Sequence, residues 1–238
     1  MQSGFQALDQ LSVTSAALFL DFDGTLARLA DQPENVRLDS SDLDELAQVY
    51  HSLGGALAIV TGRDIATLDQ FLAPHIFPAS GVHGFETRTQ NGRIQRLNAN
   101  TQALAGLEQV LTRHVGQHDG LLLERKPASL ALHYRQRPEL ARACEQAVED
   151  ALRGEAGLYV IHGKRVIEIK AHDGDKGKAD AALLDSAPYR TRKPFFIGDD
   201  TTEEAAFDVV NARSGISIKV VLGETDARYR LADPSEVH

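Results

Sequence analysis

Residues 16–26 read AALFLDFDGTL, an apolar run that ends abruptly in two aspartates. Residues 16–20 are continuously hydrophobic, which is typical of a strand buried on both faces of a parallel sheet. Successive strand side chains point to opposite faces, so Asp21 and Asp23 point the same way from the carboxyl end of this strand. Two carboxylates there can bind one hard cation and divide nucleophilic and acid–base roles. The alternative is that they only cap the turn at Gly24.

The segments around this run alternate between strands and helices. We predict helices over residues 41–51, 178–184 and 203–210 and another that ends near residue 72. Further buried strands are predicted over residues 56–60, 76–82, 194–197 and 216–221. This βαβ alternation predicts a parallel sheet with right-handed crossovers.

The pattern changes near Asn98. A helix over residues 101–115 precedes strands over 120–124 and 129–134, which a turn at 125–128 joins. A second helix over 139–153 precedes strands over 158–161 and 165–169. Because helix and hairpin occur twice, we predict an inserted α+β domain built from a duplicated unit. The predicted domains are residues 98–170 and a discontinuous domain of residues 1–97 and 171–238.

The composition of the 238-residue chain is that of a globular protein with a sizeable core, because 42% of its residues are hydrophobic and 25% are charged. The net charge of −9 argues against nucleic acid or an anionic membrane as the main partner. We find no charged-then-apolar leader and no long apolar run, so neither secretion nor membrane spanning is expected. We expect a cytoplasmic monomer.

The chain has one cysteine, which leaves no partner for an internal disulfide and agrees with a reducing cytoplasm. Cys144 falls on an apolar stripe at helical spacing with Leu140, Ala147 and Ala151. We interpret it as a small buried hydrophobe and not as a catalytic thiol.

Polar residues follow three of the predicted strands. Asp21 and Asp23 follow the first, Thr61 the second, and Asp199 and Asp200 the strand at 194–197. Ligands of open α/β sheets bind outside the carboxyl ends of the strands. The sequence therefore predicts one ligand site at this edge of the sheet.

These residue types suit phosphoryl transfer, which requires an in-line nucleophile, cations over the phosphoryl oxygens and a proton for the leaving alcohol. Asp21 can attack phosphorus and form an aspartyl-phosphate. Magnesium is the expected companion, and Asp21, the backbone carbonyl of Asp23 and Asp199 would bind it through oxygen. Asp23 can protonate the leaving oxygen and later deprotonate water.

Two further residues fit the same chemistry. Thr61 can donate its hydroxyl to a phosphoryl oxygen, or it caps the following helix, and the two roles are compatible. Lys176, in a flexible segment before a helix, carries an ammonium suited to phosphate and to screening Asp21, although such a lysine is usually solvated. His114 and His118 are spaced like a metal-binding pair, but Gly116 interrupts the helix, so we interpret them as solvated.

Taken together, the motifs resemble the haloacid dehalogenase (HAD) superfamily of phosphatases. Within it the chain resembles the trehalose-6-phosphate phosphatase family over nearly its whole length. The motifs that carry the resemblance are DFDGTL at 21–26, TGR at 61–63, GVHG at 81–84, ERK at 124–126, GKRVIE at 163–168 and GDDTTEEAAF at 198–207, with Lys176. The glycine-rich loops of dinucleotide-binding enzymes and P-loop kinases are absent.

The resemblance implies an α/β fold, in which a Rossmann-like parallel-sheet HAD core carries an inserted α+β cap of type C2. It implies that Asp21 is the nucleophile, that Asp23 is the acid and base, and that Asp199 completes the magnesium site. Asp200 would support the metal-bound waters or Lys176. The residues implied to bind substrate are Thr25, Arg63, His83, Glu124, Lys126 and Glu168.

The substrate residues have alternatives of their own. Glu124, Lys126 and Glu168 would reach hydroxyls of the distal glucose, or they belong to an exposed hairpin with a solvated ion pair. His83, near Gly81 and Gly84, would orient substrate or brace Arg63. The family usually has Asp where this chain has Glu203, which leaves a direct metal role there open.

The expected reaction is magnesium-dependent hydrolysis of trehalose 6-phosphate through an aspartyl-phosphate. One alternative is a phosphatase of sucrose 6-phosphate or a hexose phosphate, which would use the same core. Another is a catalytically silent sugar-phosphate sensor, against which the presence of both Asp21 and Asp23 argues.

Overall fold

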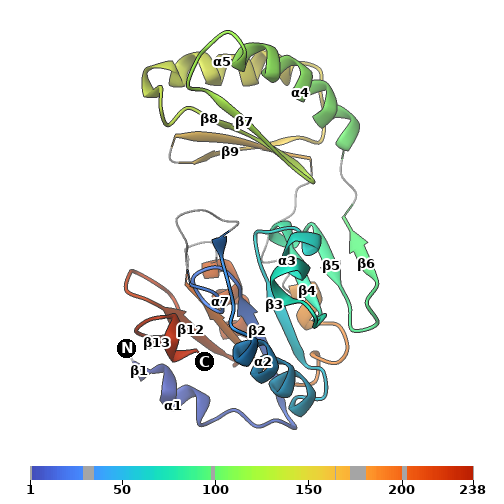
Figure 1. Cartoon of the computed structure of the whole chain (residues 1–238), viewed down its shortest axis with the longest axis vertical. Coiled ribbons are helices and arrows are strands. Elements are labelled where there is room, and N and C mark those ends of the chain that lie inside the picture. The colour runs from blue at the N-terminus through green and yellow to red at the C-terminus, as the bar shows by residue number, and fades with distance from the viewer. Residues whose placement is uncertain are drawn as a thin grey trace. The chain divides into compact units, whose positions relative to one another are not determined.

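The computed structural model describes residues 2–28, 35–97, 100–163, 165–171, 181–199 and 203–237, with the backbone alone at 2, 83 and 101 (Figure 1). The chain divides into two compact units, one of Met1–Arg96 with Gly174–His238 and one of Leu97–Asp173. We call them the core unit and the cap unit.

The core unit is built on a nine-stranded sheet in the order β1-β13-β12-β11-β2-β3-β4-β5-β6. Neighbouring strands are parallel from β1 to β4, and the β4–β5 and β5–β6 pairs are antiparallel. The strands are β1 (Gln2–Ser3), β2 (Ala16–Asp21), β3 (Leu57–Val60), β4 (Ala79–Gly81), β5 (Glu86–Arg88), β6 (Ile94–Arg96), β11 (Lys193–Gly198), β12 (Ile216–Val220) and β13 (Tyr229–Leu231).

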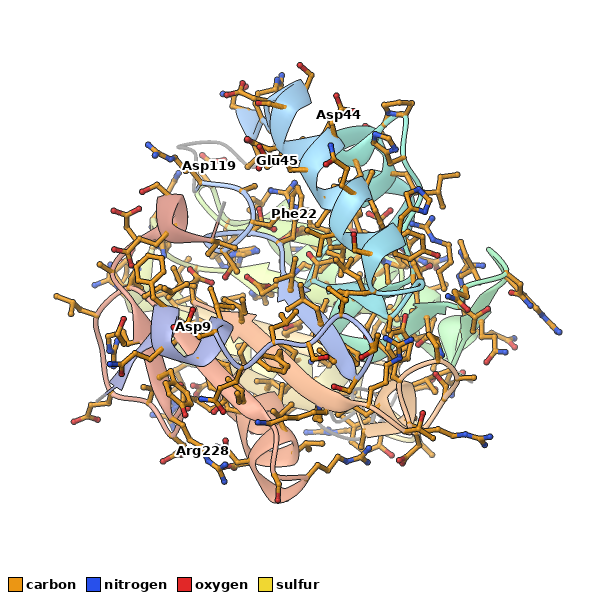
Figure 2. The ribbon with its side chains drawn as sticks, turned by 90° about the horizontal axis from the view of Figure 1, so that it is seen from below. Asp9, Phe22, Asp44, Glu45, Asp119 and Arg228 are labelled. Atoms are coloured by element: carbon orange, nitrogen blue, oxygen red, sulfur yellow. The ribbon has the colours of Figure 1, made fainter. Side chains whose placement is uncertain are left out.

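Helices of the core unit connect these strands: α1 (Gly4–Leu8), α2 (Ser40–Ser52), α3 (Ile65–Leu72) and α7 (Glu204–Ala212), with 3₁₀ turns η2 (Val82–Gly84) and η5 (Pro234–Glu236). Helix α2 shows why they form, because Leu43 and Leu46 are buried on one face. Asp44 and Glu45 on α2 are exposed, and Figure 2 shows them at the outside of the unit.

The central strands are apolar and buried along their whole length. All six residues of β2 and all four of β3 are buried, as are residues 194–198 of β11. Burial on both faces explains why these strands read as continuous hydrophobic runs. Phe22, Phe195 and Phe207 are among the largest fully buried side chains of this core. The strands that carry the predicted site residues are therefore packed into this apolar core.

The cap unit is a four-stranded antiparallel sheet in the order β7-β8-β10-β9, with two helices side by side on one face (Figure 1). Its elements are α4 (Thr101–Val115), β7 (Leu122–Lys126), β8 (Ser129–His133), η3 (Pro138–Leu140), α5 (Ala141–Ala151), β9 (Tyr159–Gly163) and β10 (Val166–Lys170). Helix and hairpin thus occur twice, as predicted. Where the cap unit begins and ends, the amide of Asn100 donates to the carbonyl of Ala171 at 3.0 Å.

Some local predictions were wrong. Arg125 and Lys126 belong to β7 and not to the turn, which leaves Pro127 and Ala128 to connect β7 and β8. Strand β4 covers only Ala79–Gly81 of the predicted 76–82, and α1, β1, β5, β6 and β13 were not predicted. Of the predicted helix 178–184, residues 181–184 are helical and the others lie outside the described residues.

Cys144 is buried on α5, as its place on the apolar stripe predicted. Burial raises the pKa of its thiol above the ordinary value, and nearby Glu145 adds to this effect. A thiol with a raised pKa is a poor nucleophile at neutral pH. None of the described helices has the length and apolar character needed to cross a membrane.

Candidate functional site

The predicted convergence at the strand ends is present in the core unit. Strands β11, β2 and β3 are neighbours and run parallel, so their carboxyl ends lie at one edge of the sheet. Asp21 is the last residue of β2, Thr61 follows β3, and Asp199 follows β11. Asp21 is only 6% exposed and Thr61 is fully buried. These three residues therefore share the position where α/β sheets bind ligands.

Three carboxylates form a cluster at this edge. Asp21, Asp199 and Glu203 each offer one oxygen, and these oxygens lie within 4.8 Å of one another. Asp21 and Glu203 are buried and Asp199 is half-buried. Gathering anionic groups in a buried place is costly unless a cation neutralises them. Carboxylate oxygens are also the donors that magnesium prefers, so the cluster fits this ion.

Two glycines allow the carboxylates to approach so closely. Gly24 has φ +84°, and a Cβ added to it would overlap the carboxylate of Asp199. A Cβ on Gly198 would lie 2.7 Å from Cγ of Glu203. The left-handed turn at Gly24 is closed by its amide, which donates to the carbonyl of Ala27 at 2.7 Å. A side chain at either position would therefore push against one of these carboxylates, and at Gly24 the positive φ also favours glycine.

Glu203 was the residue whose direct metal role the sequence left open. Its position immediately before α7, together with its burial, puts its carboxylate within reach of Asp21 and Asp199. The longer side chain therefore reaches the cluster. Asp200, the predicted support of the metal waters, lies outside the described residues.

Asp23 is held by an arginine. The Arg63 guanidinium donates from Nε to Oδ2 of Asp23 at 2.7 Å and from Nη2 to Oδ1 at 2.6 Å. The same guanidinium carbon lies 4.7 Å from the ring centre of Phe71 and 5.8 Å from that of Phe22. Forked pairs of this kind are strong and directional. Arg63 therefore fixes the orientation of Asp23, and its role in binding substrate stays a prediction.

The loop that carries Thr61 and Arg63 is fixed at several points. Oγ1 of Thr61 accepts from the amide of Arg63 at 3.1 Å, so the hydroxyl hydrogen of Thr61 can be donated elsewhere. The carbonyl of Arg63 accepts from the amide of Val82 at 2.9 Å. The cap of α3 is Asp64, whose side chain accepts from the amide of Thr67 at 2.8 Å. The alternative in which Thr61 caps this helix is therefore wrong, and its phosphoryl-binding role stays a prediction.

Sequence reasoning missed Glu86, which supports this loop from β5. Its side chain is buried and accepts from the amide of Ile65 at 3.0 Å and from Arg96 at 2.8 Å. An isolated glutamate shortly after GVHG was a signal in the sequence, but only the β4–β5 pairing turns it toward α3.

The remaining predicted core residues are placed as follows. Thr25 is fully buried, and its Oγ1 makes no hydrogen bond with any described residue. His83 lies in η2, but its side chain is outside the described part. Lys176 also lies outside the described residues.

Glu124, Lys126 and Glu168 lie on one face of the cap sheet. Glu124 and Glu168 both pair with Ala131, from opposite sides of β8. Lys126 lies two residues beyond Glu124 on the same strand, and its Nζ is 3.9 Å from Oε1 of Glu168. Strand alternation puts these side chains on the face opposite Leu130 and the other residues buried under the helices.

His114 and His118 are half-buried with ring centres 4.7 Å apart, so the interpretation of both as solvated was too simple. Nδ1 of His118 is hydrogen-bonded to the carbonyl of His114 at 3.0 Å. Burial, and secondly the neighbouring His118, lower the pKa of His114 below its ordinary value. The pair joins no three-residue metal cluster among the described side chains.

Comparison with known proteins agrees with this geometry. Residues 19–235 match the sequence model of the family described as trehalose-phosphatase. A protein of Sinorhizobium fredii named "probable trehalose-phosphate phosphatase" is 41% identical over 205 residues, 86% of this chain and 77% of the relative. The trehalose-6-phosphate phosphatase of Escherichia coli is 36% identical over 221 residues, 93% of this chain and 83% of the relative.

Among solved structures, a trehalose-6-phosphate phosphatase related protein has 27% identity and a TM-score of 0.72, with coverage of 94% of this chain and 93% of the other. The predicted fold class, a HAD core with an inserted α+β cap, is confirmed. From the match over residues 19–235 and the identity to these relatives, the chain belongs to the trehalose-phosphatase family.

Proposed function

We propose that this chain hydrolyses trehalose 6-phosphate to trehalose and phosphate, with magnesium as cofactor. The observation that carries the proposal is the cluster of Asp21, Asp199 and Glu203 at the carboxyl ends of parallel strands. Membership of the trehalose-phosphatase family supports the choice of substrate.

Asp21 is the proposed nucleophile. One of its carboxylate oxygens attacks phosphorus, the bond between phosphorus and the sugar oxygen breaks, and an aspartyl-phosphate forms. For this step Asp23 carries a proton on one oxygen, which is then released from the Arg63 fork, and it gives that proton to the departing sugar oxygen. In the second step Asp23 takes a proton from water, the water oxygen attacks phosphorus, and phosphate leaves with Asp21 restored.

Other core residues hold the phosphoryl group. Thr61 donates its hydroxyl to a phosphoryl oxygen, and Lys176 places a positive charge near phosphate and Asp21. Thr25, Arg63 and His83 are proposed to contact the substrate, and Asp200 to support the metal-bound waters or Lys176. The fork from Arg63 also sets the direction in which Asp23 presents its oxygens.

The proposed magnesium site consists of the carboxylates of Asp21, Asp199 and Glu203 and the backbone carbonyl of Asp23. When bound, magnesium supplies positive charge that reduces the repulsion between an anionic substrate and the carboxylates. The close packing of Asp199 and Glu203 on Gly24 and Gly198 supports such a shared site.

Glu124, Lys126 and Glu168 are proposed to bind hydroxyls of the distal glucose. Charged side chains make stronger hydrogen bonds than neutral ones, and these three belong to one sheet face. We also propose that the cap domain covers residues 98–170 and that the protein is a monomer. A cytoplasmic location is proposed as well, and the single cysteine supports that location.

The test is a panel of phosphate esters, assayed for phosphate release with magnesium and with a chelator. The expected result is turnover of trehalose 6-phosphate well above sucrose 6-phosphate and hexose phosphates, and its loss with the chelator until magnesium is restored. Preference for another ester would contradict the substrate. Binding of trehalose 6-phosphate without any phosphate release would indicate a sensor instead of an enzyme.

A further inference from the structure

Strand β8 lies between the two glutamates of the cap sheet and presents Ser129, Ala131 and His133 to the same face. Glu124 on β7 and Glu168 on β10 flank Ala131 in one row across the sheet. Ser129 and His133 are the diagonal neighbours of these glutamates. This strand is therefore placed to control both acidic side chains.

Each glutamate is held by one side chain of β8. Oγ of Ser129 donates to Oε1 of Glu168 at 2.8 Å, and Nε2 of His133 is 2.9 Å from Oε2 of Glu124. An ionised carboxylate only accepts hydrogen bonds, so Nε2 of His133 must carry the hydrogen. The other oxygen of each carboxylate makes no hydrogen bond within the described part of the chain.

The two held glutamates flank one residue of β8. Their strands are two positions apart in the sheet, so the stems of the two side chains are separated by about 9–10 Å. Ala131 is only 2% exposed, so neighbouring side chains cover the strand between these stems, whereas the side chains of Glu124 and Glu168 stay 46% and 21% exposed.

We infer that His133 and Ser129 are positioning residues that set the direction and spacing of Glu124 and Glu168, and thereby the selectivity of the enzyme for a disaccharide phosphate. The inference rests on the proposed function, because it assumes that these glutamates bind sugar hydroxyls. Long glutamate side chains lose rotational freedom when they bind a ligand, and prior fixation by β8 reduces that cost.

The test measures kcat and KM of the full chain on trehalose 6-phosphate and on p-nitrophenyl phosphate, which has no sugar. His133→Met and Ser129→Ala are expected to raise KM for trehalose 6-phosphate about tenfold, because each removes a hydrogen bond to a charged group. The kcat on p-nitrophenyl phosphate should stay within twofold of wild type. His133→Gln should recover most of the KM, because its amide can donate from nearly the position of Nε2.

The matched control is His162→Met. His162 is an exposed histidine of β9 that pairs with Ile167, so it belongs to the face opposite His133. It should leave both substrates unchanged. If His133→Met behaves like the control, or if it lowers activity on both substrates equally, the positioning role is wrong. If His133→Met does not fold, Ser129→Ala and His133→Gln decide the question. The quantity compared is then again the change on trehalose 6-phosphate relative to the change on p-nitrophenyl phosphate.

Failure of the proposed function gives a different result. In that case the wild-type protein itself does not prefer trehalose 6-phosphate. If it prefers another sugar phosphate, the positioning role is tested by comparing the change on that ester with the change on p-nitrophenyl phosphate. If it turns over p-nitrophenyl phosphate alone, both proposals are wrong.

Discussion

The core and cap units present their polar residues in two different ways. In the core unit the site residues lie at the ends of parallel strands and are mostly buried, as with Asp21 at 6% exposed. In the cap unit they lie along the middle of antiparallel strands, and the side chains of Glu124 and Glu168 are 46% and 21% exposed. Tight turns and glycines fix the first set, and cross-strand neighbours fix the second.

This difference separates two kinds of effect. A change at the buried strand ends should reduce activity on every phosphate ester, because these residues would act on the phosphoryl group and the metal. A change on the open cap face should alter only the choice of sugar. The following experiments test this separation, from the largest expected effect to the smallest.

Asp21→Asn should reduce turnover of every ester by at least about a thousandfold, because an amide lacks the anionic oxygen that attacks phosphorus. Phosphate release measures the loss, and circular dichroism checks that the fold is retained. Near-normal turnover in this variant would refute Asp21 as nucleophile.

Glu203→Gln should raise the magnesium concentration needed for half-maximal activity about tenfold or more, since it removes one negative charge from the carboxylate cluster. Titration calorimetry with magnesium alone gives a second readout. The control is Asp208→Asn, which changes an exposed carboxylate on α7, the helix that follows Glu203. Equal magnesium affinity in both variants would show that Glu203 is not a ligand.

Arg63→Lys should lower kcat about tenfold on both trehalose 6-phosphate and p-nitrophenyl phosphate, because lysine cannot reproduce the two-point fork that holds Asp23. Arg213→Lys is the matched control, because Arg213 pairs with Asp185 at the surface of the same unit. An effect limited to trehalose 6-phosphate would mean that Arg63 recognises the sugar instead.

Lys126→Ala and Glu168→Ala should each lower kcat/KM on trehalose 6-phosphate about tenfold and leave p-nitrophenyl phosphate within twofold. Each change removes a charged hydrogen-bonding group from the face of the cap sheet that is proposed to bind the sugar, and it leaves the residues proposed to act on the phosphoryl group intact. Equal losses on both esters would show that the cap does not recognise the sugar, and would remove the contrast between the units.

The smallest effect concerns His114, whose folded-state pKa is lowered. Above about pH 6.5 the ring is neutral in both folded and unfolded chains and contributes nothing to pH dependence. As the pH falls below that value, the unfolded chain gains the proton first, so stability falls. The melting temperature of His114→Gln should therefore drop less between pH 7.5 and 5.5 than that of wild type. An equal drop in melting temperature for His114→Gln and wild type would contradict this account.

How much of the structure could be predicted from the sequence differs between the long apolar strands and the short polar ones. Strands β2, β3 and β11 are apolar runs that end in polar residues, so both the parallel sheet and the place of Asp21, Thr61 and Asp199 could be predicted. The three-residue strands β5 and β6 consist mostly of polar and charged residues and show no apolar run, and they were missed.

The supporting residues of the site escaped prediction because they depend on register. Glu86 reaches the amide of Ile65 only through the pairing of β5 with β4, and no local pattern reveals this. The link between His133 and Glu124 likewise requires the alignment of β7 with β8, and the turn there was predicted two residues too early. The reach of Glu203 depended on the exact backbone distance to Asp21.

The hydrogen bond from Asn100 to Ala171 has a wider consequence. It brings the entry and exit of the insertion together, so a short linker could replace the entire module without reordering a single strand of the sheet that remains. Modules joined in this way are suited to exchange between relatives. The residues proposed to bind the sugar and those proposed to hydrolyse the ester could then change independently of each other in evolution.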